Sequence, residues 1–238
     1  MTKWGVFCLV LLGLAACENN DTGPVYPVQD ALYEWVFSPD AQDPKSQRAP
    51  DISDPVLTFQ LNAGQRRSSM RFPGNFNLGQ AKMVGFDIRV GRTRLPRRPI
   101  TISRVRRVGP DGTEILSVQL DAKRGVTLFG RTCIPAKDLQ DWHRVEMRMR
   151  FSNQDTGFLE VFCDRKPFWG QRAVRTTQPP TCKLSDGCTT PVERPIRFEW
   201  EFGLMADRAV PRRTDIQMQR LHERRLFVIP NRIRPDDL

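Results

Sequence analysis

Apolar and polar residues alternate with a period of two along much of the chain. The clearest segment runs from Val145 to Phe151, where apolar residues occupy the odd-numbered positions and charged residues the even-numbered ones. Successive side chains of a strand point to opposite faces of a sheet, so this alternation predicts a half-buried β-strand. A polar turn ending at Gly157 and an apolar-rich stretch follow, and we therefore predict a β-hairpin over 144–163.

Further segments with strand-like patterns follow one another at short intervals. In 196–202, for example, apolar residues alternate with Arg197, Glu199 and Glu201. Only short helical stretches are expected, for example around 135–141, because no segment sustains an apolar stripe with the 3.6-residue period of a helix. The other predicted strands are 56–61, 67–72, 82–90, 99–108, 114–120, 125–129 and 215–229.

This succession of strands predicts the fold class. About ten strands in roughly 200 residues, joined by connections that contain proline and glycine, indicate an all-β domain with two antiparallel sheets packed as a sandwich or jelly roll. We place this single domain at 31–238. The proline-rich stretch 39–55 is expected to be an ordered loop or an N-terminal wrap rather than a linker between domains.

The first 16 residues have the pattern of an export signal. A positively charged start at Lys3 is followed by an apolar stretch that is too short to cross a bilayer. The stretch ends in Leu-Ala-Ala-Cys at 14–17, which resembles the lipobox of bacterial lipoproteins. The resemblance implies that 1–16 is removed, that Cys17 is acylated, and that 17–30 is the lipidated cysteine with a polar tether.

The lipobox also implies where the protein is located. A lipid-anchored protein of the bacterial cell envelope is expected, and Glu at position 18 favours the outer membrane, facing the periplasm or the cell surface. Several acyl chains would give the stable membrane anchoring that a single chain does not give. An ordinary signal peptide with an incidental cysteine is the alternative.

Four cysteines remain after the signal and the lipidation site: Cys133, Cys163, Cys182 and Cys188. An even number in an exported chain predicts disulfides, and three pairings are open. We favour Cys182–Cys188, which closes a small loop, with Cys133–Cys163 joining strands or their ends. The cysteines lack paired CxxC spacing and have only His143 nearby, so a zinc site is the weaker alternative, and we expect neither a metal nor a cofactor.

Arginine dominates the charge of the chain. The formal net charge is +10, with 30 arginines and 7 lysines. Guanidinium groups can donate two parallel hydrogen bonds to carboxylate or sulfate oxygens, so an arginine-lined sheet suits an acidic polysaccharide. Phosphates of lipopolysaccharide, an acidic protein partner and ordinary solvated faces are the alternatives, and no specific nucleic-acid partner is expected of an envelope protein.

Three segments resemble one enzyme family. The hairpin that begins at Trp142 and turns at Gly157 is similar to one in bacterial polysaccharide lyases of the heparin lyase I and glucuronan lyase type. The stretch 67–72 resembles their Arg-Ser-Glu-Leu strand, and 198–204 resembles their late Tyr-Phe-Lys-x-Gly strand. The order along the chain agrees over roughly 55–229, and the resemblance implies a concanavalin A-like jelly roll.

The departures from this family concern its catalytic residues. The resemblance implies Gln and His on a middle strand and Tyr on the late strand, for neutralising a uronate carboxylate and moving protons. The corresponding middle strand, 100–108, contains neither Gln nor His, and the late strand has Glu199 and Glu201 where Lys and Tyr are expected. Both tyrosines of the chain, Tyr26 and Tyr33, lie far upstream. No catalytic residue is assigned.

Several charged residues are candidates for a ligand cleft on one face of the jelly roll. The paired carboxylates could serve a glycoside hydrolase, but the Glu-x-Asp-x-x-Glu run of those enzymes is absent, and salt bridges to Arg197 and neighbouring arginines are the simpler interpretation. His143 and His222 are interpreted as structural or surface residues. Loops around 62–66, 91–98 and 171–194 are expected at the cleft edges. The cleft candidates are Arg67, Arg71, Arg104, Arg106, Glu199 and Glu201.

The leading hypothesis is a lipid-anchored envelope protein that binds an acidic polysaccharide through a basic concave sheet and is non-catalytic or catalytically divergent. A polysaccharide lyase acting by β-elimination on a uronate-containing glycan is one alternative. A structural or protein-interaction lipoprotein is another. The sequence does not fix which strand faces form the cleft, because a register change of one residue exchanges the two faces of a sheet.

Overall fold

A computed structural model describes residues 34–35, 48–53, 55–90, 95, 97–108, 114–177 and 197–226. Every regular element in these ranges is a strand, and they contain no helix that is long and apolar enough to cross a membrane. The strands are β1 (Glu34–Trp35), β2 (Asp51–Ser53), β3 (Val56–Leu61), β4 (Arg67–Asn77), β5 (Ala81–Val90), β6 (Ile100–Arg107), β7 (Glu114–Asp121), β8 (Gly125–Leu128), β9 (Arg131–Ile134), β10 (His143–Arg150), β11 (Gly157–Cys163), β12 (Lys166–Val174), β13 (Arg197–Met205) and β14 (Thr214–Leu226).

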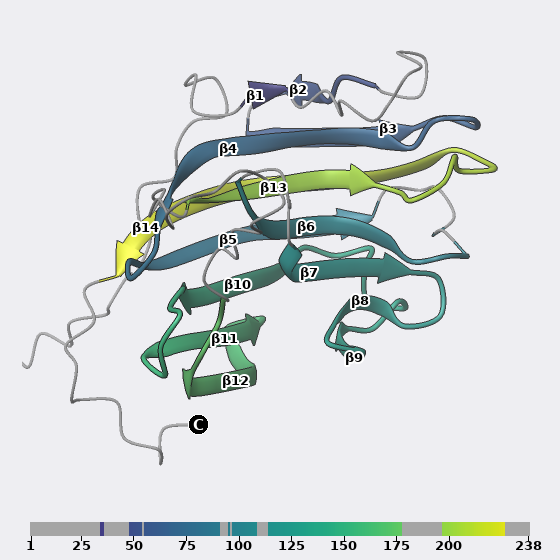
Figure 1. Ribbon diagram of the computed structural model, residues 1–238. Coiled ribbons are helices and arrows are strands. Elements are labelled where there is room, and N and C mark those ends of the chain that lie inside the picture. Colours follow the sequence, from purple (N-terminus) through teal and green to yellow (C-terminus); the bar gives the residue numbers. More distant parts are fainter. Residues whose placement is uncertain are drawn as a thin grey trace, which may run out of the picture.

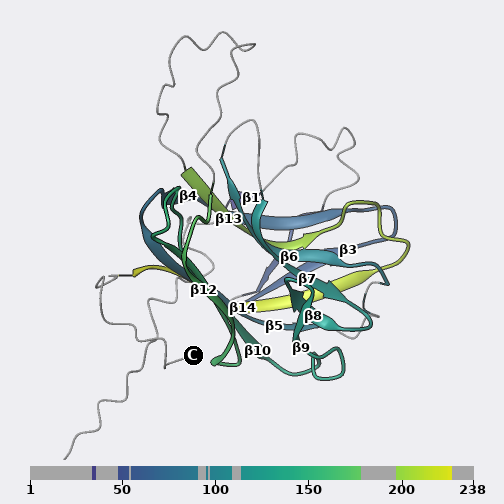
Figure 2. The same ribbon diagram turned by 60° about the horizontal axis from the view of Figure 1, so that its bottom comes forward.

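The strands form two sheets that pack as a sandwich (Figure 1; Figure 2 gives a second view). The first sheet has the order β1-β4-β13-β6-β7-β8-β9, and the second has the order β12-β11-β10-β5-β14-β3-β2. All neighbouring strands are antiparallel. The predicted all-β sandwich of two antiparallel sheets is therefore confirmed.

The core lies between the sheets, and β13 contributes its largest side chains. Phe198, Trp200 and Phe202 alternate along β13 and are fully buried. The ring centroid of Trp200 lies 6.4 Å from that of Phe86 on β5, across the sandwich. The indole Nε1 of Trp200 donates a 2.8 Å hydrogen bond to Ser103 Oγ on the neighbouring strand. The apolar half of the predicted 196–202 alternation is thus the centre of the core.

The predicted hairpin over 144–163 is present as β10 and β11. Val145 pairs with Cys163 and Arg150 with Phe158 across it. Four strands, β1, β2, β9 and β12, were not predicted. The helical stretch expected around 135–141 is wrong: these residues form turns, in which the amide of Asp138 donates to the carbonyl of Pro135 at 3.0 Å.

One edge of the first sheet is linked to the second sheet. Cys133 on β9 forms a disulfide with Cys163 at the end of β11, as expected. Close by in the chain, the ring of Phe129 lies with its centroid 4.2 Å from that of Trp169 on β12. A covalent bond and an aromatic contact therefore join the two sheets at this edge. The signal, the lipidation site at Cys17 and the expected Cys182–Cys188 pair lie outside the described residues.

Candidate functional site

The charged residues of β13 lie between β4 and β6, near the middle of the first sheet. Their side chains alternate with the buried aromatic residues and therefore point to the outer face of the sheet. In the strand register, Glu201 lies directly opposite Arg71 on β4 and opposite Arg104 on β6, and Glu199 lies opposite Arg106. Residues opposite each other across antiparallel strands share a face, so the register brings acidic and basic side chains together.

All six cleft candidates meet on this outer face. We call it the arginine face and define it by Arg67, Arg71, Arg104, Arg106, Glu199 and Glu201. Four guanidinium groups surround two carboxylates, which leaves a surplus of two positive charges.

Glu201 is the buried centre of the arginine face, with no exposed surface. Its Oε2 accepts hydrogen bonds from Nε and Nη2 of Arg104 at 2.9 and 2.8 Å. Its Oε1 accepts from Arg67 Nη2 and, at 2.7 Å, from Ser69 Oγ. The Ser69 hydroxyl in turn accepts from Arg67 Nε at 3.1 Å. The carboxylate is thus held by three side chains from the two flanking strands.

The surroundings of Glu201 keep it ionised. Burial alone would raise its pKa, but the charges of Arg104 and Arg67 and the hydrogen bonds from Ser69 and Arg104 outweigh burial, so the pKa is lowered. Arg67 is also largely buried, and desolvation lowers its pKa despite its pairing with Glu201. A carboxyl group with a lowered pKa is a poor general acid at neutral pH.

Glu199 forms the second pair of contacts. Its Oε1 accepts a hydrogen bond from Arg106 Nε, and its Oε2 lies 3.5 Å from Arg71 Nη1. The expected partner Arg197 is not among these contacts, and the flanking strands supply the cations instead. The salt-bridge interpretation of the two glutamates therefore agrees with the geometry, with different arginines as partners.

Charge is arranged by depth on this face. The side chains of Glu201 and Glu199 are 0% and 6% exposed, whereas those of Arg106 and Arg71 are 28% and 38% exposed. A ligand that approaches the sheet therefore meets guanidinium groups before it meets a carboxylate. The paired carboxylates of a glycosidase must reach the scissile bond, and these two are covered by arginines.

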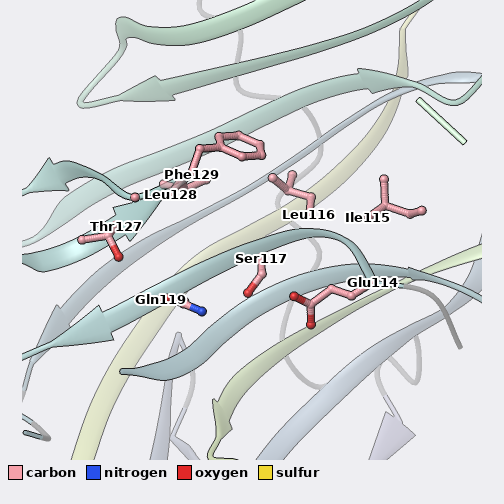
Figure 3. A pocket seen from close by; sticks show the side chains of 9 residues that line it. Glu114, Ile115, Leu116, Ser117, Gln119, Thr127, Leu128 and Phe129 are labelled. Atoms are coloured by element: carbon pink, nitrogen blue, oxygen red, sulfur yellow. The ribbon is translucent and has the colours of Figure 1, made fainter. Parts of the chain in front are cut away.

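A hollow of about 260 Å³ adjoins the arginine face over β7 and β8 (Figure 3). Ser117 on β7 lies opposite Arg104, and Gln119 lies opposite Thr127 on β8, so hydroxyl and amide groups continue the same outer face. Glu114 marks the border, with its Oε2 3.9 Å from Arg104 Nη1. The other lining residues are Ile115, Leu116, Leu128, Phe129 and Gly130.

Sequence reasoning did not single out this hollow. Its polar residues belong to an ordinary alternating strand pattern, which gives no signal of a site. The structure adds the ring of Phe129, 46% of which remains exposed beside a turn. Neutral polar groups beside an exposed aromatic ring suit the hydroxyl-rich edges and apolar faces of a saccharide.

Gly203 allows β13 to approach β4 closely. Its φ is +124°, and a Cβ atom there would lie 2.4 Å from the carbonyl oxygen of Ser68. No side chain fits that space, and few residues adopt that backbone conformation. The close packing of β13 against β4 therefore requires glycine at position 203. Gly203 lies opposite Ser69, whose hydroxyl donates a hydrogen bond to Glu201.

Both histidines belong to the second sheet, away from the arginine face. His143 begins β10, and its ring nitrogens lie 2.8 Å from Asp164 Oδ2 and 2.8 Å from the carbonyl of Asp138. Burial would lower its pKa, but these contacts outweigh burial and raise it. The structural interpretation of His143 agrees with these contacts, which tie the start of β10 to two turns.

His222 lies on β14 and is 3% exposed. Burial, followed by the nearby charge of Arg144, lowers its pKa to about 4. Its imidazole occupies the space beside Gly85, where a Cβ atom would lie 2.3 Å from Cε1. The ring is therefore a neutral packing group near neutral pH.

The described residues contain no group of three or more His, Cys, Asp or Glu side chains that could hold a metal ion. The arrangement on the arginine face points to anion binding by guanidinium groups. The six residues that define the arginine face are arginines and glutamates, both histidines lie on the other sheet, and Tyr26 and Tyr33 lie outside the described residues.

No protein-family model matches the chain, and no curated protein matches it. Solved structures do match. The endo-β-1,4-glucuronan lyase from the fungus Trichoderma reesei is similar with a TM-score of 0.54 and 13% identity, over 74% of this chain and 82% of that one. The fold is that of a polysaccharide lyase jelly roll. This confirms the predicted fold class.

Two alginate lyases have the same fold. A variant of alginate lyase Aly36B in complex with an alginate trisaccharide matches with a TM-score of 0.53 and 12% identity, over 75% of this chain and 85% of that one. Alginate lyase AlgAT5 of polysaccharide lyase family 7 matches with a TM-score of 0.50 and 9% identity, over 75% and 83%. At these identities the likeness concerns the lyase jelly roll alone.

Proposed function

We propose that this protein binds an acidic, uronate-containing or sulfated polysaccharide on its arginine face and does not cleave it. The observation that carries this proposal is the layered charge, with the partly exposed Arg71 and Arg106 above the buried Glu199 and Glu201. Buried carboxylates hold the guanidinium groups in fixed positions, and pre-positioned guanidinium forks bind carboxylate or sulfate oxygens with little loss of side-chain entropy.

The comparisons support the choice of ligand class. The similar structures include a glucuronan lyase and an alginate lyase with a bound alginate trisaccharide, both acting on or binding uronate polymers. The hollow beside Ser117, Gln119 and Phe129 adds neutral polar groups and an aromatic ring next to the arginines. Arginines that can bind uronate carboxylates and neutral polar groups that can bind sugar hydroxyls therefore lie on one continuous face.

The absence of cleavage rests on the side chains of this face. β-Elimination needs a base and an acid near the uronate C5 proton and the leaving oxygen. Among the described residues, both histidines lie on the other sheet, and the carboxylates of the arginine face are covered and paired. Guanidinium groups stay protonated and can stabilise an anion without abstracting a proton.

The binding experiment uses the full chain, purified in mild detergent with its disulfide intact. Alginate, glucuronan, a sulfated glycan and a neutral glucan are titrated at low and at physiological salt. We expect saturable binding to one acidic polymer that persists at physiological salt. Weak binding to every polyanion that disappears with added salt would contradict a specific site, because it is the behaviour of a diffuse positive surface.

Arg71→Gln is the variant of choice. Arg71 is the most exposed of the four arginines, and its contact with Glu199 is long, so its removal disturbs folding least. We expect a loss of affinity of about tenfold, the effect of one charge-assisted hydrogen bond pair. Arg148→Gln on the second sheet is the matched control, since it removes one arginine that is also paired with a glutamate. An equal loss in both variants would refute the assignment to this face.

Cleavage is tested in the same samples. Elimination leaves an unsaturated uronate that absorbs in the ultraviolet, and we expect no such product from any polymer of the panel. Product formation that is abolished by Arg71→Gln would establish a lyase instead. Specific capture of one envelope protein without glycan selectivity would favour the protein-interaction alternative.

We also propose that Cys17 anchors the protein by lipid in the bacterial cell envelope, in the outer membrane. The support is the Leu-Ala-Ala-Cys run after an apolar stretch at the N-terminus. Metabolic labelling with a radioactive fatty acid should label the wild type and not Cys17→Ser. Labelling of both proteins, or of neither, would refute lipidation at this cysteine.

A further inference from the structure

A cavity of about 560 Å³ lies at the end of the sandwich where β13 leads into β14. Its walls come from 97–100, at the start of β6, from 206–212, and from Thr214. The volume lies in the range of about 300–1,000 Å³ that small-molecule sites occupy. We call this cavity the end pocket.

The connection between β13 and β14 that forms one wall is held in place. Val210 exchanges backbone hydrogen bonds with the β3–β4 turn: its amide donates to the carbonyl of Gln65 at 2.8 Å and its carbonyl accepts from Gly64 at 2.9 Å. The amide of Ala206 donates to the carbonyl of Arg66 at 2.8 Å. The wall is therefore fixed by three backbone hydrogen bonds at two points.

The charge of the end pocket is strongly positive. Among the described residues, four arginines line it, Arg97, Arg98, Arg208 and Arg212, and Asp207 is the one acid. Within the described ranges, none of these four guanidinium groups has an ion-pair or hydrogen-bond partner. The arginines on the sheet faces behave differently, since Arg104 and Arg144, for example, each pair with a buried acid.

The floor of the same cavity is apolar. Ile100 and Val210 are 3% and 6% exposed, and the other apolar lining residues are Pro99, Ala206, Ala209 and Pro211. Unpartnered cations at the rim and apolar groups below them suit a ligand with an anionic head and a less polar body.

We propose that the end pocket binds a phosphomonoester, with the phosphate held by Arg208 and Arg212 together with Arg97 or Arg98. A phosphomonoester carries nearly two negative charges and three acceptor oxygens, which match several guanidinium groups better than a single carboxylate does. This site is separate from the arginine face, whose cations are already paired with Glu199 and Glu201. The phosphate can belong to a soluble sugar phosphate or to a lipid headgroup.

The test uses the full chain in mild detergent and two probes at physiological salt. Glucose 1-phosphate and a water-soluble, short-chain phosphatidic acid are each titrated by calorimetry. We expect saturable binding to at least one probe. Binding to glucose 1-phosphate alone identifies a soluble ligand, and binding to the short-chain phosphatidic acid alone identifies a lipid headgroup. No saturable binding to either probe would overturn the proposal.

Two variants locate the binding. The double variant Arg208→Gln/Arg212→Gln should lose at least about tenfold in affinity, because it removes two charge-assisted contacts. The control Arg131→Gln/Arg165→Gln removes the same charge from exposed positions on β9 and the β11–β12 turn, and should stay within about twofold. Equal losses in the two double variants would overturn the proposal, since they would reflect net charge alone.

A third variant keeps every arginine and fills the cavity. Ala209→Trp places a large ring at an exposed position of the lining and should abolish phosphate binding. Unchanged binding in this variant would refute the end pocket as the site. Polysaccharide binding to the arginine face is measured in the same variants and should be unaffected, so the failure of one proposal is distinguishable from the failure of the other.

Discussion

Nε and Nη2 of Arg104 both donate to a single oxygen of Glu201, at 2.9 and 2.8 Å, across the β6–β13 boundary. Arg67 and Ser69 satisfy the other oxygen from the opposite strand. The carboxylate therefore serves as the common acceptor of two flanking strands, and its removal affects both.

Glu201→Gln should destabilise the fold. The substitution leaves Arg67 and Arg104 largely buried without a compensating charge, and breaking a buried pair by removing one partner costs about 3–5 kcal/mol. The free energy of unfolding in urea measures the loss. Glu114→Gln is the control, because Glu114 is 43% exposed and its contact with Arg104 is 3.9 Å long, so a change below about 1 kcal/mol is expected there.

The same variant has a defined pH dependence. The folded-state pKa of Glu201 lies below its ordinary value of 4.5, so its stabilising contribution is present above that value and is lost as the pH falls through the folded-state pKa. The difference in unfolding free energy between wild type and Glu201→Gln should therefore shrink in acid. A difference that stays constant down to the acid limit of folding would contradict the assigned charge state.

His222 should destabilise the protein in mild acid. Its pKa is lowered from 6.5 to about 4 in the fold, so the unfolded chain binds a proton at a higher pH than the folded one. Stability from this residue is present above about pH 6.5 and is lost as the pH falls toward 4, by about 2–3 kcal/mol. Urea unfolding at pH 7 and near pH 4.5 measures the loss, which should be absent from His222→Gln. An equal pH dependence in the two proteins would show that other groups cause it.

The Cys133–Cys163 disulfide should contribute about 3–4 kcal/mol. It closes a loop with a sequence separation of 30 residues, which restricts the unfolded chain. The double variant Cys133→Ser/Cys163→Ser should therefore unfold at a lower urea concentration than the wild type. Cys182→Ser/Cys188→Ser is the comparison variant. A larger effect of that second pair would show that the stabilising cross-link lies elsewhere.

Gly203→Ala should cost more than about 2 kcal/mol. Its Cβ would lie 2.4 Å from the Ser68 carbonyl oxygen, and the strand would have to move or strain. Gly64→Ala is the control with a similar positive φ, +86°, and no atom within 4 Å of the added Cβ, so only the backbone cost of about 1 kcal/mol is expected. Thermal unfolding separates the two. Equal shifts in the melting temperature would rule out the close approach as the cause.

Strands with one apolar face and one polar face could be predicted from the sequence. The segment from Phe198 to Phe202 alternates because one face meets the core aromatics and the other meets charged strands, and this contrast is visible in the residues themselves. β9 escaped prediction because burial does not alternate along its four residues, and its place in the sheet depends on pairing with β8 and on Cys163.

The six candidate residues could be named from charge and from the family resemblance, but their partners could not. Glu201 and Arg67 are 134 residues apart, and only the folded register brings them together. Which group is covered and which faces solvent also depends on side-chain packing. The neutral polar residues of β7 and the unpartnered arginines of the end pocket carry no sequence signal that distinguishes them from an ordinary surface.

On the arginine face the carboxylates are buried and the guanidinium groups lie above them, and this arrangement affects how the face responds to pH. Its cations are guanidinium groups, which stay protonated in any ordinary medium, and its deepest acid, Glu201, is held ionised by them. Neither histidine belongs to it. The charge of this face should therefore change little between mildly acidic and alkaline pH. Binding to a sulfated polymer would then persist while the external pH changes.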